Sequence, residues 1–178
     1  MGMPARCEAT LCFETSKLAG IAALWHENAD ENGLPPRRAF NAHTLKNVLP
    51  NVIIADRVQE DGRHRYRFRV IGTTISELLG ELTGKVLDEA VVSPFRERWS
   101  AVLESANQAG SSLRIFGRLE YRKQDYIAME MMVAPLGTHV GHADAVLVIA
   151  QPSYSSRHLF HPLVKDKVAA QGASAQRA

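Results

Sequence analysis

Two long segments of the chain place their apolar residues at helical spacing. In residues 17–27 these positions recur every three or four residues and leave one polar side, which predicts an amphipathic helix with Thr15 or Ser16 as its N-cap. The same spacing returns after Ser93-Pro94 and continues to Gly110, a residue typical of a helix C-terminus. The second segment is predicted to be the longest helix.

Two shorter helices are indicated by their capping residues. Asn41 is a suitable N-cap for a helix over residues 43–49, which Pro50 would close. The run Thr74-Ile75-Ser76-Glu77 has the spacing of a capping box and predicts a helix that ends near Gly80. We therefore expect one short helix on each side of the first pair of strands.

Other segments change to the period of a β-strand. Residues 52–58 and 65–71 are rich in β-forming residues, and Asp61-Gly62 between them is a strong signal for a two-residue hairpin. Three further strands are predicted at residues 113–121, 127–136 and 145–154. Two strands, a helical crossover and three more strands suit one antiparallel sheet with helices on one face. With the N-terminal amphipathic helix, this is an α+β arrangement.

The hairpin also predicts which residues face each other. The expected pairs are Ala55 with Phe68, Asp56 with Arg67, and Glu60 with Arg63. In the second strand, Tyr66, Phe68 and Val70 then face inward, and Arg63, Arg65, Arg67 and Arg69 face outward. In the later strands, the expected pairs are Leu113 with Val133, Ile115 with Met131, Leu119 with Met129, and Arg118 with Glu130.

Length and composition fit one domain with tails. The 178 residues divide into a flexible N-terminus at 1–14, a single domain at 15–154 and a C-terminal tail at 155–178. Hydrophobic residues make up 46% and charged residues 22%, so a normal core is expected. The net charge of +2 is too small for the phosphate attraction that drives nucleic-acid binding. Without a membrane span or signal peptide, the sequence predicts a soluble cytoplasmic protein.

Several short motifs in this element order are shared with a known family. They are Leu24-Trp25, Leu49-Pro50, the run Tyr66-Arg67-Phe68-Arg69-Val70-Ile71-Gly72-Thr73, Ile75, Leu79-Gly80, and the run Glu81-Leu82-Thr83-Gly84-Lys85-Val86-Leu87-Asp88. Over residues 17–154 the chain resembles a PAS domain, and in particular the single-domain bacterial PAS family common in alphaproteobacteria. The resemblance implies a five-stranded sheet cupped by short helices around a small cavity, with sensing or regulation of a partner as the role.

A pocket between the sheet and the crossover helices would be lined by apolar residues. The candidates are Tyr66, Phe68, Trp99, Ile115, Met129 and Met131. Apolar walls with a few polar groups usually bind small molecules. Aromatic and methionine residues at strand and helix spacing also fill ordinary cores, so a solid core is the alternative.

The cofactor, if any, is not identified by the sequence. A cysteinyl-flavin photosensor needs a cysteine beside the flavin, whereas Cys7 and Cys12 precede the domain body and also offer no disulfide framework. A haem sensor needs an axial ligand, and residues 94–110 contain no histidine, which leaves only His43 and His64 as remote candidates. His139 and His142 have a zinc-like spacing but lie in a predicted glycine-containing turn without further ligands, so no metal site is predicted.

A partner surface is predicted on the outward face of the first two strands. Its arginines have Asp56 and Glu60 as neutralising partners, which favours a solvated face. Ile54 and Val58 share this face and would be partly exposed unless something covers them. The helix at 17–27, through Leu18, Ile21 and Trp25, is a suitable cover, from the same chain or from a neighbour's. These five apolar residues suggest a homodimer or a signalling partner.

The leading functional hypothesis is a stand-alone sensory or regulatory domain in signal transduction. It would bind a small molecule, a protein partner, or both, with the first helix and the sheet face as the route of the signal. A small α+β pocket enzyme of the isomerase or hydratase type is the alternative, and Asp56 or Glu130 could serve as its base. Both carboxylates have expected arginine partners that would hold them ionised at the surface. A structural adaptor with a solid core is the third hypothesis.

Overall fold

A sheet with helices on both sides forms the domain. The computed structural model describes residues 6–8, 13–29, 33–121, 125–139 and 142–152, so the predicted tail at 155–178 lies outside the described residues. The strands are β1 (Arg6–Glu8), β2 (Val52–Glu60), β3 (Arg63–Ile71), β4 (Leu113–Tyr121), β5 (Asp125–His139) and β6 (His142–Pro152). The helices are α1 (Ser16–Glu27), α2 (Thr73–Leu79), α3 (Leu87–Ala90) and α4 (Phe95–Ala109), with 3₁₀ turns η1 (Arg37–Ala39) and η2 (Leu49–Asn51).

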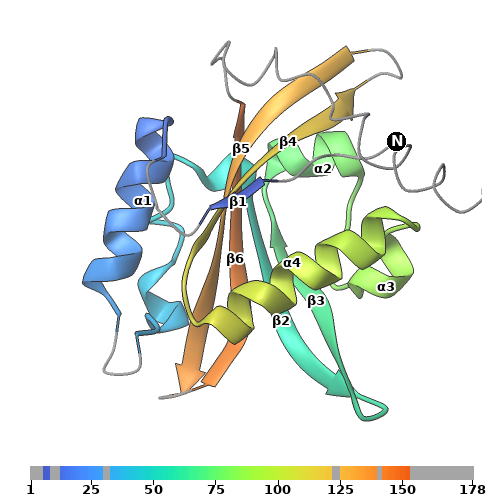
Figure 1. The fold of residues 1–178 in the computed structure, drawn as a ribbon, viewed down its shortest axis with the longest axis horizontal. Helices are drawn as coiled ribbons and strands as arrows, with labels where there is room; N and C mark the ends of the chain where they lie inside the picture. The colour runs from blue at the N-terminus through green and yellow to red at the C-terminus, as the bar shows by residue number, and fades with distance from the viewer. Residues whose placement is uncertain (1–5, 9–12, 30–32, 122–124, 140–141, 153–178) are drawn as a thin grey trace, which may run out of the picture.

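The sheet has the antiparallel arrangement that the element order predicts. Within the described residues, its strand order is β1-β4-β5-β6-β2-β3, and all neighbouring strands run antiparallel. The five long strands form the predicted sheet, and the α+β fold class is confirmed. The three-residue β1 adds an edge strand beside β4, in a segment expected to be a flexible N-terminus. Helix α1 lies on one side of the sheet and α2, α3 and α4 lie on the other (Figure 1).

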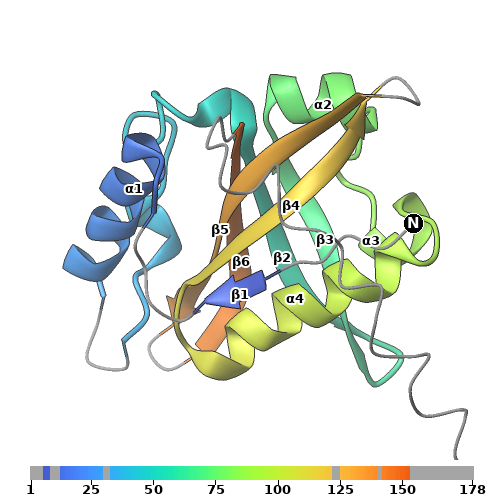
Figure 2. The ribbon, with the colours of Figure 1, turned by 45° about the horizontal axis from the view of Figure 1, so that its top comes forward.

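One apolar layer, here called the inner core, fills the space between the sheet and α2–α4. Its members are buried side chains that alternate along the strands, joined by residues of the three helices: Ile53, Ala55, Tyr66, Phe68, Ile75, Leu82, Leu87, Leu103, Ala106, Leu113, Ile115, Met129, Met131, Val133, Val146, Val148 and Ala150. Figure 2 shows α4 lying across the strands on this side. The inner core therefore contains five of the six predicted pocket residues, and Trp99 packs against it.

A second layer, here called the outer core, covers the opposite face of the sheet. Leu18, Ile21 and Trp25 of α1 pack there against β5, β6 and the segment at residues 34–52. The Trp25 indole Nε1 also donates a hydrogen bond of 2.9 Å to the Pro135 carbonyl oxygen. The amphipathic helix therefore covers the sheet of its own chain, which was one of the two arrangements expected from the sequence.

The β2–β3 hairpin follows its sequence signal but contains a bulge. Asp61 and Gly62 have φ angles of 51° and 74°, and all three predicted pairs are confirmed. A register shift between Ile54 and Ala55 turns Val70 to the outer core, whereas it was expected to face inward beside Phe68. The bulge adds one residue to β3 relative to β2, and this extra residue reverses the faces beyond it.

The β4–β5 pairing is partly as predicted. Leu113 with Val133 and Ile115 with Met131 are confirmed. The other two expected pairs are wrong, because Leu119 faces Ile127 and Glu130 faces Phe116. An uninterrupted antiparallel ladder keeps a constant register, and the four expected pairs would have required a shift within it.

The short helices differ from their predictions. Residues 42–48 form turns in place of a helix, although Asn41 Oδ1 does accept hydrogen bonds from the backbone N–H groups of His43 and Thr44. A single isolated turn is costly to nucleate as a helix. Helix α2 begins after Gly72 without a side-chain cap, so the capping box is wrong, but Gly80 ends it as expected. Gly110 likewise ends α4 in the left-handed conformation.

Candidate functional site

The predicted pocket residues are brought together in the inner core. Tyr66, Phe68, Ile115, Met129 and Met131 are all buried there. Trp99 of α4 is partly buried and packs against the same cluster. Strand alternation positions the first five, because β3, β4 and β5 each turn every second side chain to this face.

Polar contacts link the inner core to α4 through Tyr66. Its hydroxyl donates a 2.8 Å hydrogen bond to Glu104 Oε2 and accepts one of 2.8 Å from Asn107 Nδ2. Glu104 is also held by the Arg57 guanidinium, with Nη2 to Oε1 at 2.9 Å. Burial and the neighbouring Glu104 carboxylate raise the pKa of Tyr66, so the phenol stays protonated. This group therefore anchors α4 to β3 and offers a neutral hydroxyl to the core.

Glu104 and Asp56 are each paired with arginine, although the arginines on Asp56 are Arg37 and Arg69 and not the Arg67 that lies opposite it in the hairpin. Burial alone would raise the pKa of Glu104, but hydrogen bonds from Tyr66 and Arg57 outweigh it and lower that pKa. Asp56 accepts hydrogen bonds from both Arg37 and Arg69. An unpaired buried carboxylate would have favoured the pocket-enzyme hypothesis, and neither of these two has that character.

Glu130 is a fully buried carboxylate, with 0% of its surface exposed. It lies in the outer core, where its Oε1 accepts a 2.7 Å hydrogen bond from Arg114 Nε. The same carboxylate accepts backbone hydrogen bonds from Glu14 and Thr15, at 2.9 and 2.8 Å. An arginine partner was predicted for Glu130, but it is Arg114 and not Arg118. The predicted surface location was wrong, because the residues at the N-terminus of α1 cover Glu130.

Hydrogen bonding keeps Glu130 ionised in this enclosed position. Burial by itself would raise its pKa, but the hydrogen bonds from Thr15, Glu14 and Arg114 together lower it. The negative carboxylate also sits at the N-terminus of α1, where the helix dipole favours an anion. Glu130 therefore satisfies the backbone N–H of the N-cap residue Thr15 from a distant strand, whereas the Thr15 side chain makes no capping hydrogen bond.

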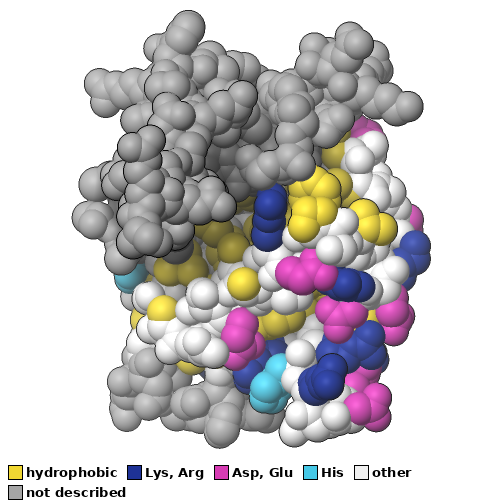
Figure 3. All heavy atoms as spheres, turned by 45° about the vertical axis from the view of Figure 1, so that its right-hand side comes forward, with side chains coloured by type: hydrophobic (Ala, Val, Ile, Leu, Met, Phe, Trp, Pro, Cys, Tyr) yellow, Lys and Arg dark blue, Asp and Glu magenta, His cyan; other side chains and the backbone are white. Residues whose placement is uncertain are grey.

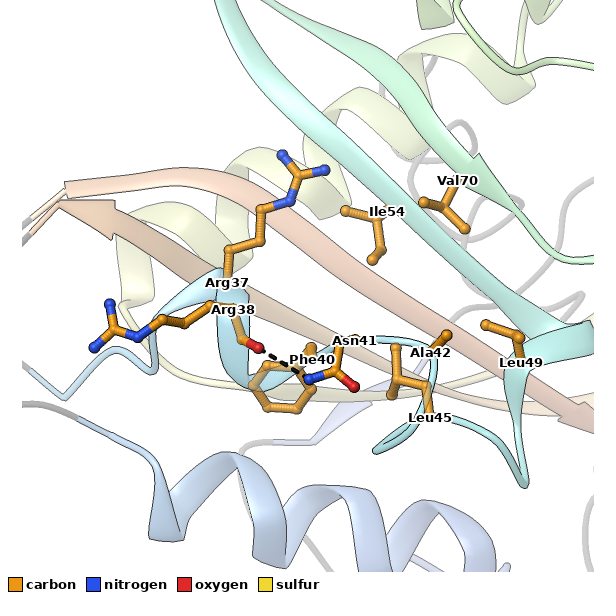
Figure 4. Close-up of a pocket in the computed structure, with 9 residues that line it drawn as sticks. All are labelled: Arg37, Arg38, Phe40, Asn41, Ala42, Leu45, Leu49, Ile54 and Val70. Atoms are coloured by element: carbon orange, nitrogen blue, oxygen red, sulfur yellow. Dashed lines mark hydrogen bonds between the residues drawn. The ribbon is translucent and has the colours of Figure 1, made fainter.

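A groove of about 450 Å³ opens on the outer side of the sheet, next to the outer core. Its apolar lining consists of Phe40, Ala42, Leu45, Leu49, Ile54 and Val70. Figure 4 shows Arg37 reaching alongside Ile54, while Arg38 extends away from the apolar side chains. The sequence reasoning found only Ile54 of these residues as partner surface. A usable signal was the absence of any Asp or Glu from residue 32 to residue 55.

Two backbone segments make a close contact next to the groove residue Leu49. Gly72, at the end of β3, lies so near η2 that an added Cβ would be 2.3 Å from the carbonyl oxygens of Leu49 and Pro50. Its N–H donates a 2.7 Å hydrogen bond to the Val52 carbonyl oxygen. Only glycine permits this approach, because the Cβ of any other residue would overlap the two carbonyl groups.

The arginines of β3 form ion pairs, as the solvated-face interpretation predicts. Arg65 contacts Glu60 of β2 and both Asp88 and Glu89 of α3. Arg67 also pairs with Glu60. In Figure 3 basic and acidic side chains are interleaved on this side of the molecule. Most of the stripe is therefore internally neutralised.

The predicted dimer surface is largely inside the protein. Leu18, Ile21, Trp25 and Ile54 are buried against their own chain, and Val58 is partly buried. The inference of a homodimer rested on their exposure, so this argument no longer supports it. Dimerisation itself stays a prediction.

The histidine and cysteine candidates are separated along the fold where the structure describes them. No group of three or more potential metal ligands occurs in the described residues. The backbones of His139 and His142 pair across the β5–β6 hairpin, and both His43 and His64 are exposed. Cys7 pairs with Ile115 through β1, and Cys12 lies outside the described residues.

Comparison with known proteins identifies the family. The sequence profile described as "PAS domain" matches residues 13–150, which is most of the chain. The chain belongs to the PAS domain family. PAS domains generally serve sensory signal transduction, which agrees with the role that the sequence motifs implied. No helix in the described part of this PAS domain is long and apolar enough to cross a membrane.

Solved structures with a similar arrangement are light-oxygen-voltage (LOV) proteins. An RNA-binding light-oxygen-voltage receptor shares 13% identity with a TM-score of 0.46, covering 85% of this chain and 39% of its own. The Aureochrome1 LOV blue-light photoreceptor shares 14% with a TM-score of 0.43, covering 67% of this chain and 92% of its own. The Rhodobacter sphaeroides LOV protein shares 11% with a TM-score of 0.43, covering 82% and 72%. The PAS domain thus spans about two fifths of the RNA-binding receptor. No curated protein matches its sequence.

Proposed function

We propose that this PAS domain is a sensory or regulatory module that binds a small molecule in the inner core and signals through a protein contact on the outer side of the sheet. The observation that carries the proposal is the division of β5 between the two cores. Met129 and Met131 face the inner core, and Glu130 between them holds the N-terminus of α1. A ligand that shifts β5 would therefore change the contacts of Glu130.

The inner core has the composition of an adaptable binding site. Met129 and Met131 have flexible side chains that can repack around an apolar ligand. The hydroxyl of Tyr66 supplies a polar group that can reorient from Glu104 or Asn107 toward a ligand. Apolar walls with few polar groups are typical of small-molecule sites. An apolar small molecule with one hydrogen-bonding group is thus the ligand class that this proposal favours.

Native mass spectrometry of the full chain, with a denatured control, tests the proposal. We expect a mass excess under native conditions that disappears on denaturation, with an absorption spectrum that identifies a chromophore if one is present. The variant Met131→Trp should fill the inner core and reduce the excess. Leu79→Ser, at an exposed residue of α2, is the matched control and should retain it.

Three results would redirect the assignment. A native mass equal to that of the chain alone contradicts small-molecule retention and favours a ligand-free adaptor. A retained molecule that is chemically converted favours the pocket enzyme. Retention that survives Met131→Trp in a folded variant would move the binding site out of the inner core. Tyr66→Phe, a milder change in the same core, provides the second reading if Met131→Trp does not fold.

A further inference from the structure

The groove on the outer side of the sheet combines an apolar floor with a basic rim. Phe40, Leu45 and Ile54 are buried at its base, and Val70 is partly buried beside them. Arg38, Asn41 and Ala42 are exposed at its edge, so the groove is open to solvent along that side. An apolar surface of this kind is stabilised by an occupant that removes it from water.

Positive charge dominates the groove rim. Asp56 is shared between Arg37 and Arg69, so one carboxylate faces two guanidinium groups and the trio carries a net positive charge. Arg38 has no side-chain hydrogen bond or ion pair to any described residue, and Lys46 is exposed next to Leu45. Residues 32–55, which supply most of the lining, contain no Asp or Glu. A carboxylate that docks here would therefore meet cations on more than one side.

The rim is already ordered without an occupant. Asn41 Nδ2 donates to the Arg38 carbonyl oxygen at 3.2 Å, which Figure 4 shows as a dashed line. Asn41 Oδ1 accepts from the N–H groups of His43 and Thr44, and Thr44 Oγ1 donates to the Ala39 carbonyl oxygen at 2.8 Å. These contacts fix the backbone around Arg38. Binding to a preorganised surface loses less conformational entropy.

We infer that this groove binds an acidic amphipathic peptide segment of a protein partner. Apolar anchor side chains of that segment pack on Ala42, Leu49 and Val70, the apolar lining residues that keep exposed surface. Its flanking Asp or Glu residues meet Arg38 and the Arg37–Asp56–Arg69 trio. Partner regulation is part of the proposed function, and this inference names the surface and the chemistry of the partner.

The openness of the groove favours a peptide over a small molecule. Small-molecule sites enclose about 70–90% of the ligand surface. A groove with an exposed edge leaves one side of its occupant in water, as when an amphipathic segment lays its apolar face into a groove. The arginines Arg37 and Arg38 lie at the border of the apolar surface. They can therefore pair with acidic residues on either side of an apolar anchor in the peptide.

Selection from a random peptide display library, with the full chain as target, tests the inference. We expect enriched peptides to share apolar anchors flanked by Asp or Glu. A synthetic peptide of the enriched sequence, labelled for fluorescence anisotropy, should bind about tenfold more weakly to Arg38→Glu. A peptide with its flanking acids changed to Lys should recover affinity for Arg38→Glu. Val70→Asp should remove binding by placing a charge in the floor.

A matched control lies at the hairpin tip. Arg63 is an exposed arginine on β3 and does not line the groove, so Arg63→Glu should leave peptide affinity unchanged. Arg38 is exposed, and circular dichroism should show that Arg38→Glu remains folded. This variant keeps the test valid if Val70→Asp unfolds.

Several outcomes would overturn the inference. Neutral or basic consensus sequences, no enrichment, or equal affinity for Arg38→Glu and Arg63→Glu each contradict an acidic partner. Self-association that Arg38→Glu abolishes would make a second copy of the chain the occupant. Failure of ligand retention in native mass spectrometry leaves the groove result unaffected, so the two proposals fail independently.

Discussion

The Glu130 carboxylate of β5 accepts a hydrogen bond from the backbone N–H of Thr15, the N-cap of α1, at 2.8 Å. The two residues are 115 positions apart in the sequence. A side chain in the middle of the sheet therefore satisfies the backbone N–H of the N-cap residue of the N-terminal helix. Arg114 on β4 supplies the positive charge that makes this burial possible.

Replacing this carboxylate should strongly destabilise the protein. In Glu130→Gln, Arg114 would lose its fully buried anion and keep only the longer 3.7 Å contact with the more exposed Glu14 carboxylate, and we expect the free energy of unfolding to fall by about 3 kcal/mol. Urea denaturation measures the change. Glu104→Gln, in the partly exposed pair with Arg57, should cost about 1 kcal/mol or less. Equal losses in the two variants would contradict a special role for the buried pair.

Glu130 should also contribute to the pH dependence of stability. Its pKa is lowered in the folded protein, whereas in the unfolded chain it is about 4.3. The unfolded state therefore takes up the proton first, and stability is lost as the pH falls below about 4.3 toward the folded pKa. Urea denaturation over a pH series should show a shallower acid slope for Glu130→Gln than for the wild type. Parallel slopes would disprove this contribution.

Gly72 should not tolerate a side chain. In Gly72→Ala the new Cβ would meet the Leu49 and Pro50 carbonyl oxygens, and we expect a loss of about 2–3 kcal/mol in unfolding free energy. Gly20→Ala in α1 is the control, because no atom lies within 4 Å of its added Cβ. That variant should gain about 0.5–1 kcal/mol from helix propensity. Thermal or urea unfolding would decide, and a neutral Gly72→Ala would show that η2 can move away.

The Tyr66 hydroxyl should stabilise the contact of α4 with β3. Tyr66→Phe removes the hydrogen bonds to Glu104 and Asn107, with an expected loss of about 1–2 kcal/mol. Hydrogen exchange should become faster in α4. Gln108→Ala changes another contact of Glu104, on the exposed side of α4, and should stay within about 0.5 kcal/mol of the wild type. Unchanged exchange in Tyr66→Phe would mean that apolar packing alone holds α4.

Local patterns predicted much of this fold. Asp61-Gly62 sets the hairpin because both residues adopt positive φ, and the apolar period of α1 and α4 follows from burial of one helix face. The pocket candidates were found for the same reason, since alternation along β3, β4 and β5 depends only on the strand period.

Features that depend on distant contacts were missed. The bulge opposite Ile54 turns Phe68 to the inner core and Val70 to the outer core, and the alternating residues of β3 do not mark it. Thr15 is the N-cap of α1, which was one of the two predicted positions, but the carboxylate that accepts its N–H hydrogen bond belongs to Glu130 on a distant strand and has no local sequence signal. The groove required the path of residues 37–49 over the sheet, which the expected short helix did not provide.

The packing of α1 on its own sheet limits where the chain can be truncated. A fragment that begins at Gly33 would retain every long strand and all of α2–α4, yet it would uncover Met132, Leu136 and Leu147. It would also leave Glu130 without the backbone donors of Glu14 and Thr15. Such a fragment should aggregate during expression. The smallest soluble unit is therefore expected to begin no later than Phe13, well upstream of Val52, where the first long strand begins.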